Sequence, residues 1–237
     1  VTIDIDSFPI EVHGHQPGAS YNGHYRDTVY HPLVASYSVA GNYDSMQHGH
    51  RLGNGFLHAI LRQGQVHTAQ GIRRFLQEVI VKATRLGYVV DYRMDAGYTD
   101  GETLDYLTDE HLRFIGRIKA NAVLQRMAAP HLIRPVGRPP KEGYEKIVEL
   151  GEYQAESWQH AQRLVLVVVD RPDAKTGQLD LFPNYFFLIV GWQEEELDGP
   201  AALAHYRQRG TFEDRLGEFQ QAIGPRLSHD TFAANEA

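Results

Sequence analysis

The stretch YVVDYRMD, residues 88–95, combines β-branched and aromatic residues and closes on an aspartate, Asp95. This composition favours a β-strand. A helical pattern lies on each side of it. TAQGIRRFLQEVIVKATRLG (68–87) repeats apolar residues with a helical period and stops at a glycine, and DGETLDYLTDEH (100–111) predicts a shorter helix. A strand between two helices is typical of a parallel pairing made through crossover connections.

More strands are expected around this unit. VTIDIDSFPIEV alternates apolar and acidic positions over residues 1–5, YHPLVASYSV (30–39) and SMQHGHRL (45–52) are joined by a Gly-Asn turn, and LRFIGRIK spans 112–119. The sequence therefore predicts an α/β fold, a mixed five-stranded sheet that starts with a meander and is flanked by helices.

The composition changes between about residues 121 and 180. The loop RPVGRPPKEG is basic and rich in Pro and Gly, and the β-like stretches YEKIVELGEYQAESW, RLVLVVVDRPDAKTGQLDL and NYFFLIVGW follow it. We expect a first core part at 1–120, an all-β insertion at 121–192, and a helical carboxyl-terminal part of the core at 193–237. The chain begins directly in a strand, so a fragment of a longer protein is expected.

The 237 residues carry a formal net charge of −7 and no cysteine. The absence of cysteine excludes a disulfide framework and a thiolate zinc site, and fits the cytoplasm. The apolar runs are far shorter than the roughly 20 residues that a membrane span needs. The acidic charge argues against a generic nucleic-acid binder, because phosphate binding is driven by Lys and Arg. A catalytic module that holds cations is compatible with it when another domain supplies the DNA affinity.

Two aspartates at predicted strand ends are candidates for a site. Asp4 and Asp6 lie on the same side of the first strand, with Asp6 nearer its end, and Asp95 ends the strand 88–95. If these strands are neighbours, Asp6 and Asp95 lie side by side where sites form in open α/β sheets. Adjacent carboxylates ionise together when a cation lies between them, and oxygen ligands suit Mg²⁺ or Mn²⁺. A turn or cap role stays open for Asp95, as does the choice between Asp4 and Asp6.

A third acid lies in AHYRQRGTFEDRLGEF (204–219). A helix here places Tyr206, Arg209 and Glu213 on one face. Singly, Glu213 fits a solvated helix residue, Arg209 a surface charge and Tyr206 a packing residue. Gly210 weakens a helix by about 1 kcal/mol, so a break at that position stays open. Together, two strand aspartates followed by a helical glutamate favour a metal site.

DIDSFPIEVHG, YNGHYRDTVYHPLVA, RMDAGYTD and YRQRGTFED together resemble the catalytic core of the DDE transposases of bacterial insertion sequences, the group with a Tyr-x-x-Arg-x-x-x-Glu signature. The resemblance covers nearly the whole chain. It implies a ribonuclease-H-like fold in which Asp6, Asp95 and Glu213 are the catalytic residues and hold two Mg²⁺ or Mn²⁺ ions. It also implies that Tyr206 and Arg209 contact DNA.

The resemblance further implies metal-dependent hydrolysis of DNA phosphodiesters and strand transfer at insertion-sequence ends. Its implied partner is double-stranded DNA, with a homodimer in the active complex, in the bacterial cytoplasm near the nucleoid. Two positions depart from the signature. Gln220 stands where a lysine is common, which weakens any lysine contact to DNA, and Gly210 stands where a tryptophan often follows the arginine.

Two other functions stay open. A domesticated domain that binds DNA or assembles without catalysis would keep the fold, although all three acids are present. Alternatively, some of the thirteen histidines form a metal site in a β-rich fold, from HGH at 13–15 and QHGH at 47–50 with His24 and His31. No carboxylate or third histidine stands at a fixed spacing that supports this.

Overall fold

A computed structural model describes residues 1–12, 14–39, 54–85, 89–134, 143–173, 175–210, 216–217, 227 and 231–236. These residues form two compact units. The first comprises Val1–Tyr98 and Gln208–Ala237, and the second comprises Thr99–Arg207. The expected division at residues 120 and 192 stays a prediction. In the part of the chain that the structure describes, no helix has the length and apolar character to cross a membrane.

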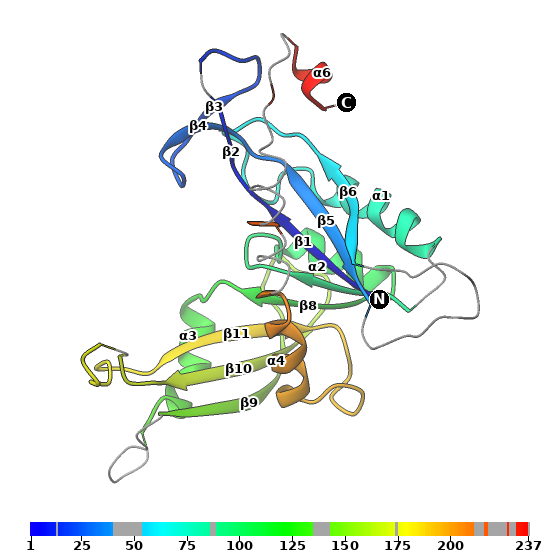
Figure 1. The fold of residues 1–237 in the computed structure, drawn as a ribbon. Helices are drawn as coiled ribbons and strands as arrows, with labels where there is room; N and C mark the ends of the chain where they lie inside the picture. Colours follow the sequence, from blue (N-terminus) through cyan, green and yellow to red (C-terminus); the bar gives the residue numbers. More distant parts are fainter. Residues whose placement is uncertain are drawn as a thin grey trace. The chain divides into compact units, whose positions relative to one another are not determined.

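The first unit contains four strands that form its main sheet: β1 (Thr2–Ser7), β5 (Leu33–Ser38), β6 (Gly55–Ile60) and β7 (Asp91–Met94). Their order is β6-β5-β1-β7 (Figure 1). β1 pairs antiparallel with β5 and parallel with β7, and β5 pairs antiparallel with β6. Ile3 and Ile5 of β1 are fully buried, so β1 is a central strand with apolar residues packed against it.

Helix α1 (Ile72–Thr84) connects β6 to β7 and packs against β6. Its apolar residues recur with the helical period and form one buried face, which holds the helix on the first unit. This face is made of Ile72, Phe75, Leu76, Val79 and Ala83.

The first unit also contains a small second sheet. It contains β2 (Ile10–Glu11), β3 (Ser20–Asn22) and β4 (Asp27–Tyr30) in the order β2-β4-β3. Near it lies the helix α6 (Phe232–Glu236), whose Phe232 packs with an apolar cluster that contains Phe8, Ile10, Tyr30, Val34 and Leu216. The carboxyl-terminal segment is therefore part of the core of the first unit.

The second unit contains four antiparallel strands: β8 (Arg113–Ile118), β9 (Tyr144–Tyr153), β10 (Gln162–Asp170) and β11 (Asn184–Val190). Their order is β8-β11-β10-β9. The centre of β10, Leu164–Val168, is fully buried, as its continuous run of apolar residues indicates. The chain thus has a mixed α/β structure whose strand pairs are mostly antiparallel.

Four helical segments belong to the second unit: α2 (Gly101–Asp109), α3 (Ala122–Ala128), η1 (Ala129–His131) and α4 (Gly199–Arg207). Side-chain caps define two of their starts. Asp100 accepts a hydrogen bond from the Thr103 amide at the start of α2, and Asn121 accepts from the amides of Val123 and Leu124 at the start of α3.

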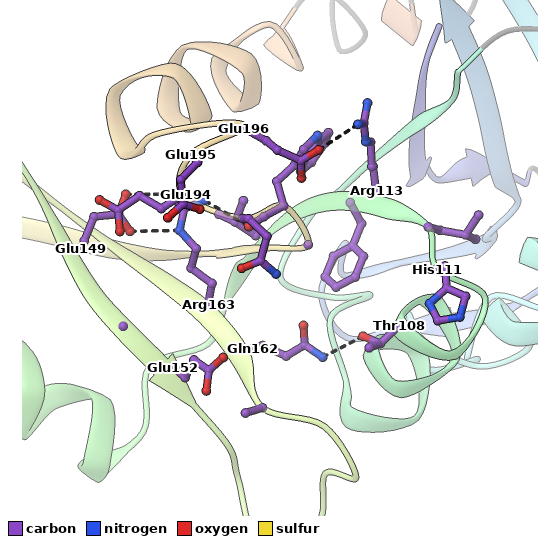
Figure 2. A pocket seen from close by; sticks show the side chains of 18 residues that line it. Thr108, His111, Arg113, Glu149, Glu152, Gln162, Arg163, Glu194, Glu195 and Glu196 are labelled. Carbon is purple, nitrogen blue, oxygen red and sulfur yellow. Dashed lines mark hydrogen bonds and ion pairs between the residues drawn. The ribbon is translucent and has the colours of Figure 1, made fainter.

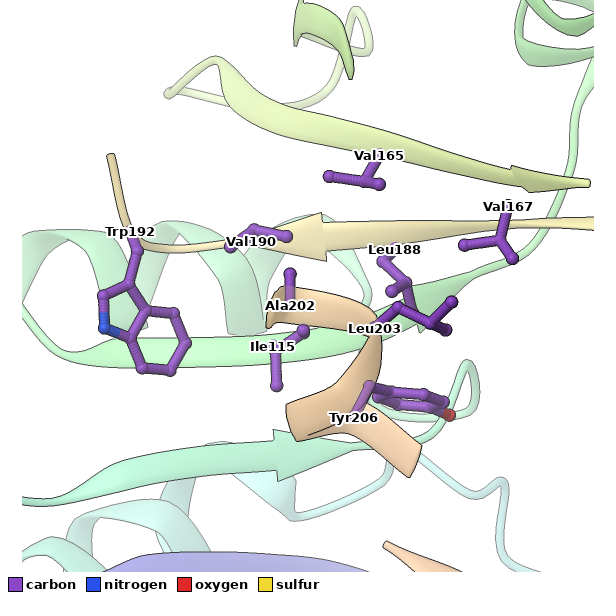
Figure 3. Packing of buried hydrophobic residues seen from close by; sticks show 9 residues of the cluster. All are labelled: Ile115, Val165, Val167, Leu188, Val190, Trp192, Ala202, Leu203 and Tyr206. Atoms are coloured by element: carbon purple, nitrogen blue, oxygen red, sulfur yellow. The ribbon is translucent and has the colours of Figure 1, made fainter. Parts of the chain in front are cut away.

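Helix α4 covers an apolar area of the second sheet (Figure 3). Its Ala202, Leu203 and Tyr206 side chains pack with residues of β8, β10 and β11, and Trp192 closes one side of the cluster. Only 9% of Tyr206 is exposed. The aromatic ring at the start of the signature segment is therefore a packing residue of the second unit.

Several expected elements are present with shifted ends. The strands expected at 1–5, 30–39, 88–95 and 112–119 correspond to β1, β5, β7 and β8, and the two expected helices to α1 and α2. The strand expected at 45–52 lies outside the described residues. The sequence pattern did not reveal β6, none of whose residues is buried, whereas the first four residues of β5 are buried.

Two expectations were wrong. The segment 121–192 is not all-β, because Asn121 caps the helix α3. The helix of the signature segment does not continue through Arg209, because α4 ends at Arg207 and a turn follows, where the chain passes from the second unit to the first.

We predict that Tyr206→Ala lowers the free energy of unfolding by about 3 kcal/mol, because truncation of a buried aromatic side chain removes its packing and leaves a cavity. Tyr206→Phe keeps the ring and is expected to retain most of that stability. Urea denaturation measures both. The control is Phe182→Ala, since Phe182 is 73% exposed in the same unit, and a change within about 0.5 kcal/mol is expected there. Equal losses for the two alanine variants would contradict the packing role of Tyr206.

Candidate active site

The parallel pairing of β1 with β7 brings two acids together. Ile5 of β1 is in register with Met94 of β7, and the next residue along each chain is Asp6 and Asp95. Neighbouring strands lie about 4.8 Å apart. Asp6 lies near the carboxyl end of β1, and Asp95 directly follows β7. The two strands that carry these acids are neighbours, as the predicted proximity of Asp6 and Asp95 requires.

The carboxylate of Asp6 accepts hydrogen bonds at both oxygens. Oδ1 accepts from the Ser7 amide at 2.8 Å, and Oδ2 accepts from Nη2 of Arg209 at 2.5 Å. The side chain of Asp6 is 21% exposed and that of Arg209 is 8% exposed. The arginine of the signature is thus the counter-ion of Asp6 in this structure. Its sequence position gave no sign of a partner 203 residues away.

Asp4 has a different environment from Asp6. Its two carboxylate oxygens accept hydrogen bonds from Nε and Nη2 of Arg93, at 2.8 and 2.7 Å, and both side chains are 1% exposed. The two residues are also register partners on β1 and β7. Asp4 is therefore fully engaged inside the sheet, which favours Asp6 over Asp4 as the first acid of the site.

Tyr98 connects the segments that carry the two acids. Its hydroxyl donates a hydrogen bond to Oγ of Ser7 at 2.6 Å, and its amide donates to the carbonyl of Asp95 at 3.0 Å. Burial raises the pKa of Tyr98 well above its ordinary value, and the negative charge of Asp6 raises it further. The hydroxyl stays protonated and remains a donor, so Tyr98 ties the turn after Asp95 to the residue that follows Asp6.

A buried arginine and a histidine lie on the same unit. Arg62 donates hydrogen bonds from Nε to the carbonyl of His31 and from Nη1 to the carbonyls of Thr68 and Gln70. Burial lowers the pKa of His31 to about 4, and the charge of Arg62 contributes to this shift. His31 is neutral near pH 7, and the hydroxyl of Tyr25 lies 3.4 Å from its Nε2. These contacts support the fold beside Asp6.

The third acid and half of the histidines considered for a metal site lie outside the part of the chain that the structure describes. Glu213, the histidines of 47–50 and His13 lie outside the described residues. Among the residues that the structure does describe, no group of three or more His, Cys, Asp or Glu side chains could hold a metal ion. Asp6 and Asp95 are the two acids of the predicted site that the structure describes.

A hollow of about 640 Å³ lies in the second unit (Figure 2). Arg163 donates to Glu149 at 2.6 Å, and Arg113 donates to Glu196 at 3.1 Å. The remaining acids leave an excess of negative charge, which repels DNA phosphates. This hollow is therefore a poor binding site for DNA. Its acidic lining residues are Glu149, Glu152, Glu194, Glu195 and Glu196.

The whole chain, residues 1–237, matches the family model described as transposase DDE domain group 1. The chain therefore belongs to this family, and it is a transposase DDE domain. This confirms the resemblance that the sequence motifs indicated. The search among curated proteins found no match.

The fold is similar to that of a solved transposase. The cryo-EM structure of a piggyBac transposase synaptic complex with hairpin DNA superposes with a TM-score of 0.51 at 13% sequence identity. The similarity covers 93% of this chain and 40% of the piggyBac chain. At this identity the likeness shows the fold alone, and the chain spans less than half the length of that transposase.

We predict that Arg93→Met destabilises the protein by about 3–5 kcal/mol, because it leaves the Asp4 carboxylate buried without its counter-charge. Asp4→Leu combined with Arg93→Met removes both charges and is expected to recover much of this loss. The measurement is a double-mutant cycle by urea denaturation.

The matched control is Arg113→Met. Arg113 pairs with Glu196, but the side chains of this pair are 44% and 50% exposed, so a loss of at most about 1 kcal/mol is expected. A loss at Arg93 no larger than that at Arg113 would show that the buried pair does not hold β1 and β7 together.

Proposed function

We propose that this chain is the catalytic domain of a DNA transposase with a ribonuclease-H-like fold. It hydrolyses and transfers DNA phosphodiesters with divalent cations held by Asp6, Asp95 and Glu213. The observation that carries the proposal is the register of β1 and β7, which aligns Asp6 with Asp95 at the carboxyl ends of adjacent strands. Membership of the transposase DDE family supports the same reaction class.

The described residues fit a hard divalent cation. Asp6 and Asp95 offer only oxygen ligands, which Mg²⁺ and Mn²⁺ prefer. The carboxylate of Asp6 already attracts a positive group, the guanidinium of Arg209. When bound, a pair of such ions supplies Lewis-acid activation of water or of a DNA 3′-hydroxyl and stabilises the leaving oxygen. Glu213 is proposed as the further ligand.

The surrounding residues orient the two acids. The Ser7 amide fixes one oxygen of Asp6, and Tyr98 holds Ser7 against the turn that follows Asp95. Outer contacts of this kind set the orientation of metal ligands and typically change metal affinity about 10- to 100-fold when removed. DNA contacts by Tyr206 and Arg209 stay part of the proposal, with the ring of Tyr206 also holding α4 on its sheet.

We extend the proposal to the partners of the protein. The similar piggyBac transposase was solved as a synaptic complex with hairpin DNA, and double-stranded DNA at insertion-sequence ends is the proposed substrate here. A homodimer is the proposed active assembly, in the bacterial cytoplasm. Because the net charge of this chain is −7, further parts of the complete protein are expected to supply most of the DNA affinity.

In the complete protein, Asp6→Asn and Asp95→Asn are each expected to lower Mn²⁺-dependent cleavage of transposon-end DNA by about 10³-fold or more, because each removes charge that balances the cation. Asp4→Asn is expected to retain partial activity, since Asp4 pairs with Arg93. Thermal melting with and without Mn²⁺ shows whether the cation still stabilises each variant.

Glu213→Gln tests the proposed third ligand in the same assays and is expected to abolish cleavage while DNA binding largely persists. The domain without catalysis makes the opposite prediction. In that case Mn²⁺ leaves the melting temperature of the wild-type protein unchanged, and none of the three acid variants alters any DNA-dependent property.

A further inference from the structure

The ion pair between Arg209 and Asp6 joins two groups with different proposed partners. Asp6 is proposed to bind a divalent cation, whereas Arg209 is proposed to contact DNA. In this structure Nη2 of Arg209 donates to Oδ2 of Asp6 at 2.5 Å, and the Ser7 amide donates to the other oxygen at 2.8 Å. The guanidinium therefore contacts an oxygen of the same carboxylate that is proposed to bind the cation.

A divalent cation and a guanidinium repel each other at the distances that one carboxylate imposes. Mg²⁺ binds oxygen at about 2.0–2.1 Å. Binding of a cation to the Asp6 carboxylate is therefore unfavourable while the guanidinium of Arg209 contacts it. A guanidinium matches phosphate as well as it matches carboxylate. Arg209 thus has two alternative anionic partners, the Asp6 carboxylate and a DNA phosphate.

We propose that Arg209 is an exchangeable internal counter-ion of Asp6, which it neutralises until a divalent cation replaces it and releases the guanidinium to a DNA phosphate. This inference rests on the proposed function, because it takes Asp6 as a cation ligand and DNA as the substrate. Its consequence is a coupling: cation binding favours DNA binding, and DNA binding favours cation binding by the same factor.

Arg93 and Arg62, the other buried arginines among the described residues of the first unit, lack the features needed for exchange. Arg93 and Asp4 are both 1% exposed and joined by two hydrogen bonds. Arg62 is held by three backbone carbonyls. By contrast, the Asp6 side chain is 21% exposed, and Arg209 lies in the turn after α4 rather than in a strand. Turn residues absorb backbone changes more readily than residues of a paired strand.

The test is made without metal, so that no ion bridges the protein to DNA. Binding of the complete protein to a transposon-end duplex is measured in EDTA as a function of salt. Asp6→Asn keeps the acceptor for the Ser7 amide but removes the charge that holds Arg209. We expect it to bind the duplex about fivefold to tenfold more tightly, with a salt dependence steeper by about one unit of slope for the added phosphate contact.

Two variants make this result specific. Asp6→Asn combined with Arg209→Ala is expected to lose both the gain and the added slope, because the released guanidinium is gone. Asp95→Asn removes one negative charge from the neighbouring strand end. A small gain in affinity for the duplex is expected, because the repulsion between protein and DNA phosphates decreases. Adding Arg209→Ala is expected to leave this small gain unchanged. Thermal melting confirms that each variant is folded.

A second measurement follows the cation. Without DNA, Arg209→Ala is expected to tighten Mn²⁺ binding about tenfold, because the competing positive group is absent, whereas Arg207→Ala leaves it unchanged, since Arg207 pairs with Glu145. Equal gains in duplex affinity for Asp6→Asn and Asp95→Asn would overturn the proposed exchange but not the proposed function. The same holds if Arg209→Ala leaves Mn²⁺ binding unaltered or weakens it. Failure of every variant to bind the duplex would overturn the exchange together with the proposed function.

Discussion

The bidentate ion pair between Asp4 and Arg93 fixes how β1 and β7 align, and the arrangement of the site follows from that alignment. Both side chains are buried and directly opposite each other in the parallel ladder. A slip of one residue would separate them and turn every side chain of the strand to the other face. The charge pair therefore makes the wrong register costly, and the correct register carries Asp6 and Asp95 to one place two residues further on.

Buried charged groups of the first unit have partners within the fold, whereas Asp6 is partly exposed. Arg93 neutralises Asp4, backbone carbonyls hold Arg62, and Ser7 receives the hydroxyl of Tyr98. Asp6 is different, because one-fifth of its side chain reaches solvent. Buried polar groups need partners inside the protein, whereas a partly exposed carboxylate can exchange partners. Among the described residues, this contrast supports the proposed role of Asp6 as a ligand rather than a purely structural acid.

The sequence predicted the helices and strands better than it predicted how the strands pair. Alternation and helical periodicity located β1, β7 and α1 because these patterns are local. The helix α3 was missed, since its seven residues lie beside a long β-like region and only the cap at Asn121 marks its start. The pairing of β8 with β11 and the contact of Arg209 with Asp6 join residues far apart in the chain. No periodicity encodes such contacts.

The distribution of charge explains why the contact of Arg209 with Asp6 bears on the proposed DNA binding. The chain has a net charge of −7, and the lining of the hollow in its second unit contains more glutamates than arginines. Each positive group that reaches a phosphate therefore has a large effect on affinity, and each acid that stays uncompensated near the DNA opposes it. In the proposed function, a divalent cation at Asp6 and Asp95 would neutralise two acids and would also release Arg209 from that task. Cation binding and DNA binding would then be coupled through the electrostatics of an acidic domain.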